Sequence, residues 1–309
     1  SLHMPANCLW FDTETKPVID ALGAEHHYLW FGYACYQRRA RGQMWEPEIW
    51  QRFESVDQFW DFVFSRCRHK TRLYLFSHNA AFDLQVVRAL TYLPSQGWDL
   101  ISAIADCPPA VFTWRKDSMT IKYVDTLNFW RMALSTVGDN IGLPKLAMPA
   151  ANASLKSWDQ YGKRDVEVIK QVCRAWFDFL VDNDLGGFSP TLASQAFNAY
   201  RHRFMPVKIF IDNNEKATQL ARDALHGGRT EAWFIGHQNS EFYLLDVNSM
   251  YPSVMYGAQY PYQLVSTYKR PQLSQIGKWI DEYCVMAEVQ IDTPEPIYPV
   301  VSQDKLIFP

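Results

Sequence analysis

Two acidic residues stand two positions apart inside an apolar segment near the start of the chain. The segment is LWFDTETKPV, from Leu9 to Val18, and the acids are Asp12 and Glu14. Its apolar and aromatic residues predict a strand, and residues i and i+2 of a strand project from one face. Two carboxylates on one face repel each other unless a cation lies between them. The pattern therefore indicates either a solvated strand edge or a site for metal ions.

Two later segments carry side chains that could complete such a site. SHNAAFD, residues 77–83, places Asn79 and Asp83 where a predicted strand passes into a helix. YGKRD places Tyr161 and Asp165 at i and i+4, on one face of a long predicted helix. Taken alone, Asn79 could be a helix cap and Asp83 a first-turn acid, and the tyrosine and aspartate could be an ordinary helix pair.

The order and spacing of these motifs resembles the DEDD superfamily of 3′→5′ exonucleases, in its tyrosine-bearing branch. DTE, HNAAFD and YGKRD follow one another within roughly residues 5–185. Hard cations prefer oxygen ligands, which explains carboxylates rather than histidine or cysteine. The resemblance implies that Tyr161 orients the attacking water. It also implies that four carboxylates hold two Mg²⁺ or Mn²⁺ ions about 3.5–4 Å apart, namely Asp12, Glu14, Asp83 and Asp165.

The same family implies contacts with the 3′ end of a single DNA strand, with Phe82 stacking on a base or packing in the core with equal weight. DTLNFW, which ends at Trp130, and KLAM, residues 145–148, resemble two elements of one polymerase branch. The second element implies a catalytic role for Lys145. The implied single-strand contacts are Thr15, His78, Asn79, Phe82, Thr126 and Leu127.

A polymerase motif follows a glycine pair at Gly186 and Gly187. LLDVNSMYPSVM resembles D-x-x-S-L-Y-P-S, the first palm motif of family B DNA polymerases, with Met250 in place of leucine. In that family the motif supplies a metal-ligating aspartate and a carbonyl ligand, a serine near the triphosphate, and a tyrosine that excludes a ribose 2′-hydroxyl. The residues at these positions are Asp246, Val247, Ser249 and Tyr251.

LHGGRTEAW lies between the two regions and resembles the Y-x-G-G element that links exonuclease and polymerase domains, with Leu225 in place of tyrosine. Gly227 and Gly228 would let the backbone approach a phosphate closely, and Arg229 is a candidate phosphate contact. The loose elements and the spacing resemble the protein-primed branch of phages, linear plasmids and their viral and organellar relatives. The implied partners are single-stranded and primer-template DNA, a terminal protein and the remainder of a polymerase chain.

Two further palm motifs, K-x-x-x-N-S-x-Y-G and D-T-D, do not occur in the sequence. One aspartate cannot hold two metal ions well, so the palm site is incomplete. We therefore expect an N-terminal piece of a longer polymerase, which degrades single-stranded DNA from the 3′ end and adds no nucleotides by itself. The full-length protein would use further Mg²⁺ and a dNTP.

These motifs require an α/β fold: a ribonuclease-H-like mixed sheet flanked by helices, followed by the start of a polymerase palm. We expect a probable vector remnant at residues 1–4, an exonuclease domain at 5–187, and linker helices with a truncated palm at 188–309. Strands are predicted at 7–15, 26–37, 42–51, 72–79, 241–248 and early in 283–300, with a hairpin at 110–127. Helices are predicted at 55–67, 80–93, 157–184, 191–204 and 213–226.

Composition fits a globular intracellular protein. The chain has 309 residues, of which 48% are hydrophobic, and a net charge of −3 that gives no basic footprint for nucleic acid. Its six cysteines are scattered, which indicates neither a zinc site nor a disulfide framework and fits a reducing compartment, cytoplasmic or elsewhere inside a host cell. We find no signal peptide and no apolar run long enough to span a membrane.

Two other functions compete with a polymerase exonuclease. A free-standing DEDD nuclease that trims RNA or DNA is one, and the palm motif argues against it. A catalytically inactive nucleic-acid-binding module is the other, and the complete set of carboxylates and Tyr161 argues against it.

Overall fold

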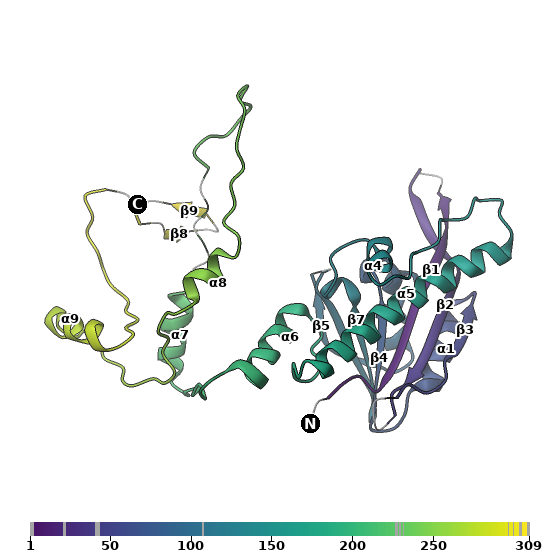
Figure 1. Ribbon diagram of the computed structural model, residues 1–309, viewed down its shortest axis with the longest axis horizontal. Helices are drawn as coiled ribbons and strands as arrows, with labels where there is room; N and C mark the ends of the chain where they lie inside the picture. The colour runs from purple at the N-terminus through teal and green to yellow at the C-terminus, as the bar shows by residue number, and fades with distance from the viewer. Residues whose placement is uncertain are drawn as a thin grey trace. The chain divides into compact units, whose positions relative to one another are not determined.

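The chain forms two compact units, Ser1–Met205 and Pro206–Pro309. The computed structural model describes all residues except 1–2, 21–22, 41–43, 107, 226–227, 229, 231, 296, 299, 303–304 and 308–309. Figure 1 shows the strands of the first unit as a twisted sheet with helices against it.

The first unit is built on a seven-stranded mixed sheet with the strand order β3-β2-β1-β4-β7-β6-β5. β1 and β4 are parallel, as are β4 and β7, and the other neighbouring pairs are antiparallel. The predicted mixed sheet flanked by helices is therefore confirmed. Its strands are β1 (Asn7–Ile19), β2 (Glu25–Arg38), β3 (Ile49–Phe53), β4 (Arg72–Ser77), β5 (Asp99–Ala105), β6 (Ala110–Lys116) and β7 (Met119–Asp125).

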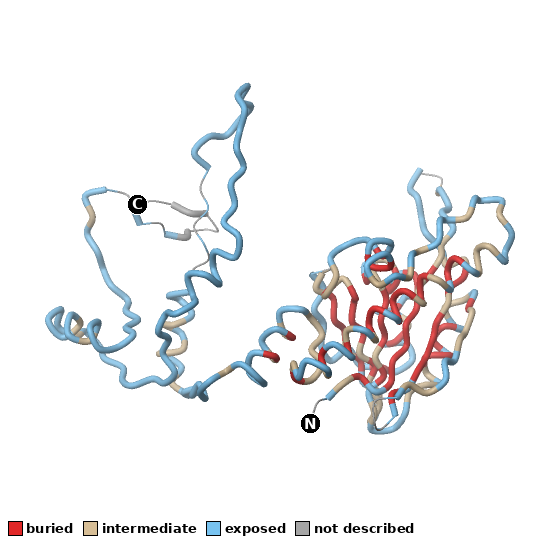
Figure 2. The backbone as a smooth tube through the Cα atoms, viewed as in Figure 1, coloured by how far each residue is buried: buried red, intermediate tan, exposed pale blue. Residues whose placement is uncertain are grey.

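Helices cover both faces of the sheet and enclose two apolar cores, and buried residues follow the central strands (Figure 2). Leu9 and Phe11 of β1 face α1 (Val56–Arg66), α2 (Ala80–Val86) and α3 (Ala89–Ser95). Cys8 and Trp10 face α4 (Leu134–Asn140) and the long helix α5 (Leu155–Asp182). Alternate residues of β1 thus bury against opposite layers, as the two-residue period of a strand requires. The first unit also contains η1 (Thr126–Asn128), α6 (Leu192–Ala199) and a turn of π-helix, η2 (Tyr200–Phe204).

Local signals set most of these boundaries. Ser55 caps α1 by accepting a hydrogen bond from the Gln58 N–H. The predicted hairpin forms from β6 and β7. The single helix predicted at 80–93 is instead two, α2 and α3, because Arg88 adopts a left-handed φ of 52° that interrupts helical geometry.

The second unit has little burial. Between residues 206 and 300, no residue whose burial is described is buried (Figure 2). The strands predicted at 241–248 and after Tyr283 are wrong for the described residues, since a strand needs a partner for its backbone groups and none pairs with them. The elements present are α7 (Glu215–Asp223), α8 (Met250–Met255), α9 (Leu273–Glu282), β8 (Val300–Ser302) and β9 (Lys305–Ile307).

Membrane insertion of a helix finds no support. Of the helices in the described part of the chain, none has both the length and the apolar character to cross a bilayer.

Candidate active site

β1 brings two carboxylates to the sheet face that α5 covers. Cys8 and Trp10 are fully buried on this face, and Asp12 and Glu14 continue the same alternation toward the end of the paired strand. A register irregularity between Glu14 and Thr15 then breaks the regular pairing with β2. The strand thus carries both acids out of an apolar core to the rim of the sheet.

α5 supplies the opposing side chains. Its Ser154 N-cap accepts a hydrogen bond from the Ser157 N–H, and its apolar stripe packs on the sheet. Tyr161 and Asp165 lie one turn apart and are 4% and 1% exposed. Ligand oxygens of Asp165, Asp12 and Glu14 all lie within 4.8 Å of one another.

Asp83 approaches from the other side of β1. It lies in α2, and its Oδ1 accepts a hydrogen bond of 2.7 Å from the Thr13 hydroxyl, whose side chain alternates with those of Asp12 and Glu14. Asp83 is therefore not part of the group of three ligand atoms within 4.8 Å, although its charge raises the pKa of Asp12. The structure brings three of the four predicted carboxylates into one group and places the fourth beside it.

Burial and mutual repulsion hold protons on this cluster. Burial raises the pKa of Asp12 well above its ordinary value, and the neighbouring carboxylates raise it further. Burial, followed by the charge of Asp165, raises the pKa of Glu14 to about 7. Burial also raises the pKa of Asp83 to about 7, against the hydrogen bonds from Thr13 and Ser77 that lower it. Several carboxylates this close together repel one another, and a bound cation would relieve that repulsion.

Lys145 is the cation that the chain itself places at the cluster. Its Nζ lies 2.6 Å from Asp165 Oδ2 and 4.9 Å from the centre of the Tyr161 ring. Burial would lower the pKa of Lys145, but the contact with Asp165 raises it well above the ordinary value. A Cβ added at Gly138 of α4 would lie 2.6 Å from the Leu143 carbonyl oxygen and 3.2 Å from the Lys145 nitrogen. Glycine at that position therefore allows the close approach that brings the Lys145 loop to the site.

The second carboxylate oxygen of Asp165 bears on whether the acidic cluster can bind a metal ion. Asp165 Oδ1 is buried and has no hydrogen-bond partner among the residues that the structure describes, although Oδ2 pairs with Lys145. An unpartnered buried carboxylate oxygen costs free energy unless another group binds it. Because Asp12 and Glu14 contribute oxygens within 4.8 Å, a hard divalent cation fits this donor set.

The residues predicted to contact single-stranded DNA separate into two groups by position. Thr15, Asn79 and Phe82 lie at the rim: Thr15 Oγ1 is 3.0 Å from His27 Nδ1, and the Phe82 ring lies 5.9 Å from the His27 ring. Asn79 is exposed with a left-handed φ of 84° and, although it is the α2 N-cap, makes no side-chain capping bond.

The other predicted contacts are built into the fold. Thr126 is buried, and its hydroxyl lies 2.8 Å from Nδ1 of His78, whose Nε2 is 2.9 Å from the Met132 carbonyl oxygen. Burial lowers the pKa of His78, which keeps the ring neutral. Leu127 is half-buried in the short helix η1.

A shallow cavity adjoins Tyr161 and Lys145. Its volume is about 500 Å³, and it combines one cationic side chain with an apolar wall. Cavities of this size are large enough to hold a small organic ligand. The lining residues are Ala133, Leu134, Ser135, Lys145, Leu146, Ala147, Met148 and Tyr161.

Comparison with models of known protein families identifies the family of this chain. The family model for DNA polymerase type B, organellar and viral, matches residues 149–307, which is more than half of the 309 residues. The chain belongs to this family. Curated protein sequences provide no match to it.

One solved structure agrees with the fold of this type B polymerase chain, and a second, more distant one shows a weaker likeness. Phi29 DNA polymerase, complexed with primer-template DNA and incoming nucleotides, matches with a TM-score of 0.52 and 14% identity, over 74% of this chain and 40% of that one. The family B DNA polymerase of the archaeon Pyrobaculum calidifontis matches with a TM-score of 0.37 and 14% identity, over 63% of this chain and 27% of that one. The chain therefore spans less than half the length of these polymerases.

The residues of the predicted palm motif lie in the second unit of the polymerase chain. Asp246 is exposed, and Ser249, with a left-handed φ of 54°, precedes α8, which contains Tyr251. The Val247 carbonyl accepts a hydrogen bond of 3.2 Å from the Met250 N–H.

The glycine-pair element lies in the same unit. A Cβ added at Gly228 would lie 2.2 Å from the Tyr251 hydroxyl, so a side chain there would require the exposed tyrosine side chain to move. Gly227 and Arg229, also predicted from this element, lie outside the described residues.

Sequence analysis missed Asp125, which holds the second motif in place. Its carboxylate accepts hydrogen bonds from the N–H groups of Asn79 (3.0 Å), Ala80 (2.7 Å) and Leu127 (2.9 Å). One buried side chain thus ties the start of α2, which carries Asp83, to η1. An acid at the end of a strand, directly before the TLNFW segment, was the available signal.

We expect Asp125→Asn to destabilise the first unit by about 1–3 kcal/mol, because an amide nitrogen in place of one oxygen leaves a buried N–H without an acceptor. Urea unfolding followed by intrinsic tryptophan fluorescence measures the change. Asp117→Asn, in the exposed turn between β6 and β7, is the matched control and should leave the midpoint unchanged. An Asp125→Asn midpoint equal to that of the unaltered protein would contradict this role.

Proposed function

We propose that this chain carries the 3′→5′ proofreading exonuclease of a type B DNA polymerase, at residues 5–187, followed by linker helices and the start of a palm at 188–309. The proposal rests chiefly on the grouping of Asp12, Glu14 and Asp165 within 4.8 Å. Asp83 and Tyr161 lie beside this group, in the order along the chain that the exonuclease motifs require.

Asp12, Glu14, Asp83 and Asp165 would hold the divalent ions, Mg²⁺ or Mn²⁺. Bound metal would supply Lewis acidity toward the attacking water and the leaving oxygen. The chain itself supplies position. Lys145 fixes Asp165 through Oδ2 and leaves the buried Oδ1 unbonded among the described residues, and its ammonium group also lies against the Tyr161 ring. Tyr161 is thereby held where its hydroxyl can orient a water beside the carboxylates.

The substrate end would enter between the two groups of predicted contacts. The cavity beside Tyr161 offers apolar side chains, among them Leu134 and Met148, on which a sugar or base can rest. Phe82 and Thr15 border the opposite side of β1, near Asp83. A single strand is favoured over a duplex, because base stacking on side chains requires unpaired bases.

The KLAM and DTLNFW elements, together with the match to organellar and viral enzymes, support placing the chain in the protein-primed branch. In that branch a terminal-protein hydroxyl is the primer. The full-length polymerase would then use primer-template DNA, a dNTP and further Mg²⁺ at Asp246.

The test is a cleavage assay with a single-stranded oligonucleotide labelled at its 5′ end. With Mg²⁺ or Mn²⁺ we expect a ladder of products shortened from the 3′ end, which EDTA abolishes. A labelled dNTP should not be incorporated into a primer-template by the 309-residue protein. Products that shorten only from the 5′ end, or none at all with either metal, would refute the exonuclease.

A further inference from the structure

A second hollow in the first unit lies at the opposite end of β4 from the carboxylates. Its volume is about 360 Å³, and its lining combines three cations, three hydroxyls and one acid: Lys70, Arg72, Arg115, Thr71, Ser118, Thr120 and Asp117. β4 starts at Arg72 in this hollow and ends at Ser77, directly before the Asn79–Asp83 motif. Five residues of strand separate the two sites by about 17 Å.

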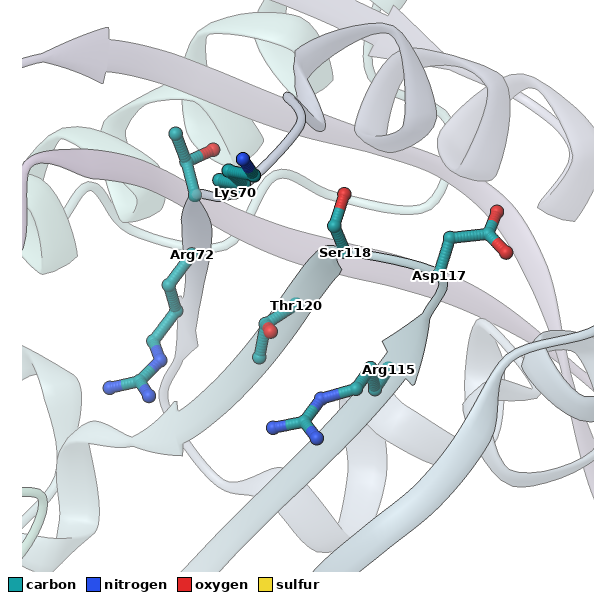
Figure 3. A pocket seen from close by; sticks show the side chains of 7 residues that line it. Lys70, Arg72, Arg115, Asp117, Ser118 and Thr120 are labelled. Carbon is teal, nitrogen blue, oxygen red and sulfur yellow. The ribbon is translucent and has the colours of Figure 1, made fainter.

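Strand register builds the basic wall of the hollow. Arg72 of β4 pairs with Thr120 of β7, which in turn pairs with Arg115 of β6. Residues paired across neighbouring strands project from one face, so two arginines flank a threonine in a single row. Figure 3 shows both guanidinium groups extending to the same side of the strands, with the Asp117 carboxylate directed away from them.

Backbone hydrogen bonds hold together the segments that line the hollow. The Lys70 N–H donates to the Ser118 carbonyl (3.1 Å), and the Thr120 N–H donates to the Thr71 carbonyl (3.2 Å). The segment before β4 is therefore fastened to the turn between β6 and β7. Arg72 is also oriented, since its Nη1 lies 3.2 Å from the Tyr74 hydroxyl. A hollow held in this way requires little reorganisation to accept a ligand.

The positive charge of this row is not neutralised within the described part of the chain. Arg39, Arg52 and Arg164 each pair with a carboxylate. Among the described residues, no carboxylate lies within ion-pair distance of Arg72, Arg115 or Lys70. Burial and then the charge of Arg72 lower the pKa of Lys122, two residues beyond Thr120 on the same face, which agrees with a positive field around Arg72.

We propose that this row is a second DNA contact, in which Arg72 and Arg115 bind a backbone phosphate of a strand away from the carboxylate site. Arginine forks match phosphate oxygens, and threonine and serine hydroxyls are common phosphate donors. Asp99 of β5 also pairs with Arg115 in the strand register, but among the described residues it forms no ion pair with it. The net charge of −3 is a sum over the whole chain and gives no sign of a local basic row. The inference goes beyond the proposed cleavage, because binding here needs neither metal nor hydrolysis.

The test is fluorescence anisotropy of a labelled single-stranded oligonucleotide with the 309-residue protein in EDTA, titrated from about 50 to about 200 mM salt. Arg72→Gln and Arg115→Gln should each weaken binding about tenfold. Each should also make the slope of log affinity against log salt less negative by about one.

Two controls come from the same unit. Asp117→Asn removes the one acid of the hollow and keeps a residue type that tolerates its φ of 52°, so it should strengthen binding. Arg88→Gln removes an exposed arginine from outside the hollow and should change nothing. Circular dichroism confirms that each variant is folded.

Unchanged affinity and salt slope in the Arg72→Gln, Arg115→Gln double variant would overturn the proposal, as would an equal loss in Arg88→Gln. Displacement of the DNA by inorganic phosphate at low millimolar concentration would also overturn it, by assigning the hollow to a free anion. Because the assay contains no metal, an inactive exonuclease leaves it unaffected. Failure here likewise leaves the cleavage proposal standing.

Discussion

Asp12→Asn is expected to lower the rate of 3′-end cleavage by about a thousandfold or more, the scale on which loss of a preorganised charge at a reaction centre is felt. Asp12 lies at the middle of the acidic group, and the charges of Asp83, Asp165 and Glu14 all act on it. Asparagine keeps the shape of the side chain and removes one anionic oxygen ligand. The measurement is the single-turnover rate on 5′-labelled single-stranded DNA in Mg²⁺.

Measurements of unfolding distinguish a loss of catalysis in Asp12→Asn from a loss of the folded structure. Because the carboxylates repel one another without metal, Asp12→Asn should unfold at an equal or higher urea concentration than the unaltered protein in EDTA. Asp83→Ala should lose cleavage comparably but forfeit the Thr13 hydrogen bond, and so gain no stability. Asp61→Asn, at an exposed position of α1, is the control for removal of an acid and should cleave at the original rate. Cleavage within tenfold of the original by folded Asp12→Asn would remove the basis of the proposed site.

Much of this site could be predicted because its chemistry fixes residue types and its fold fixes their period. Asp12 and Glu14 follow the two-residue alternation of Cys8 and Trp10, so their shared face follows from the sequence of β1. The i, i+4 spacing of Tyr161 and Asp165 likewise required only that 157–184 be helical, and α5 confirms that. Such local periodicities need no knowledge of distant contacts.

The residues that hold the site in place were not predictable in this way. Asp125 stands at a strand end, but the backbone N–H groups that it binds lie about 46 positions earlier, and the strand end does not indicate these partners. Gly32 of β2 is another case, since a Cβ there would lie 2.6 Å from the Asp12 carbonyl oxygen. Asp83 is separated from Asp12, Glu14 and Asp165 because α2 packs against the other face of β1. The sequence alone does not show which face of a strand a helix covers. Each of these depends on tertiary packing.

The predicted strand at 241–248 is a case in which a clear local pattern gave a wrong prediction. Its apolar and aromatic residues favour a strand, but propensity reflects a half-buried surface with neighbours. In the described residues of the second unit, Phe242, Leu244 and Leu245 are at least 70% exposed and pair with no strand. A strand pattern therefore predicts a strand only where a partner is present.

Without divalent metal, the protein is expected to lose thermal stability as the pH rises from about 4 to about 8. The folded chain keeps protons on Glu14 and Asp83 up to pH about 7, whereas their ordinary pKa values are 4.5 and 3.8. In this window the folded state binds more protons than the unfolded state, so the free energy of unfolding falls with rising pH. His78, with its lowered pKa, contributes the opposite slope, but it is one group against the carboxylate cluster.

The raised pKa of Asp83 alone corresponds to a loss on the order of 4 kcal/mol across the window. A fall in melting temperature on the order of 10 °C follows, measured by differential scanning fluorimetry in EDTA. Added Mg²⁺ or Mn²⁺ should raise the melting temperature more at pH 8 than at pH 5, because only ionised carboxylates bind the cation. Glu14→Gln with Asp83→Asn should flatten the EDTA profile, since neither amide titrates. A melting temperature in EDTA that rises through this window would show that the carboxylates are ionised at low pH, and with it the electrostatic need for a cation between β1 and α5 would be lost.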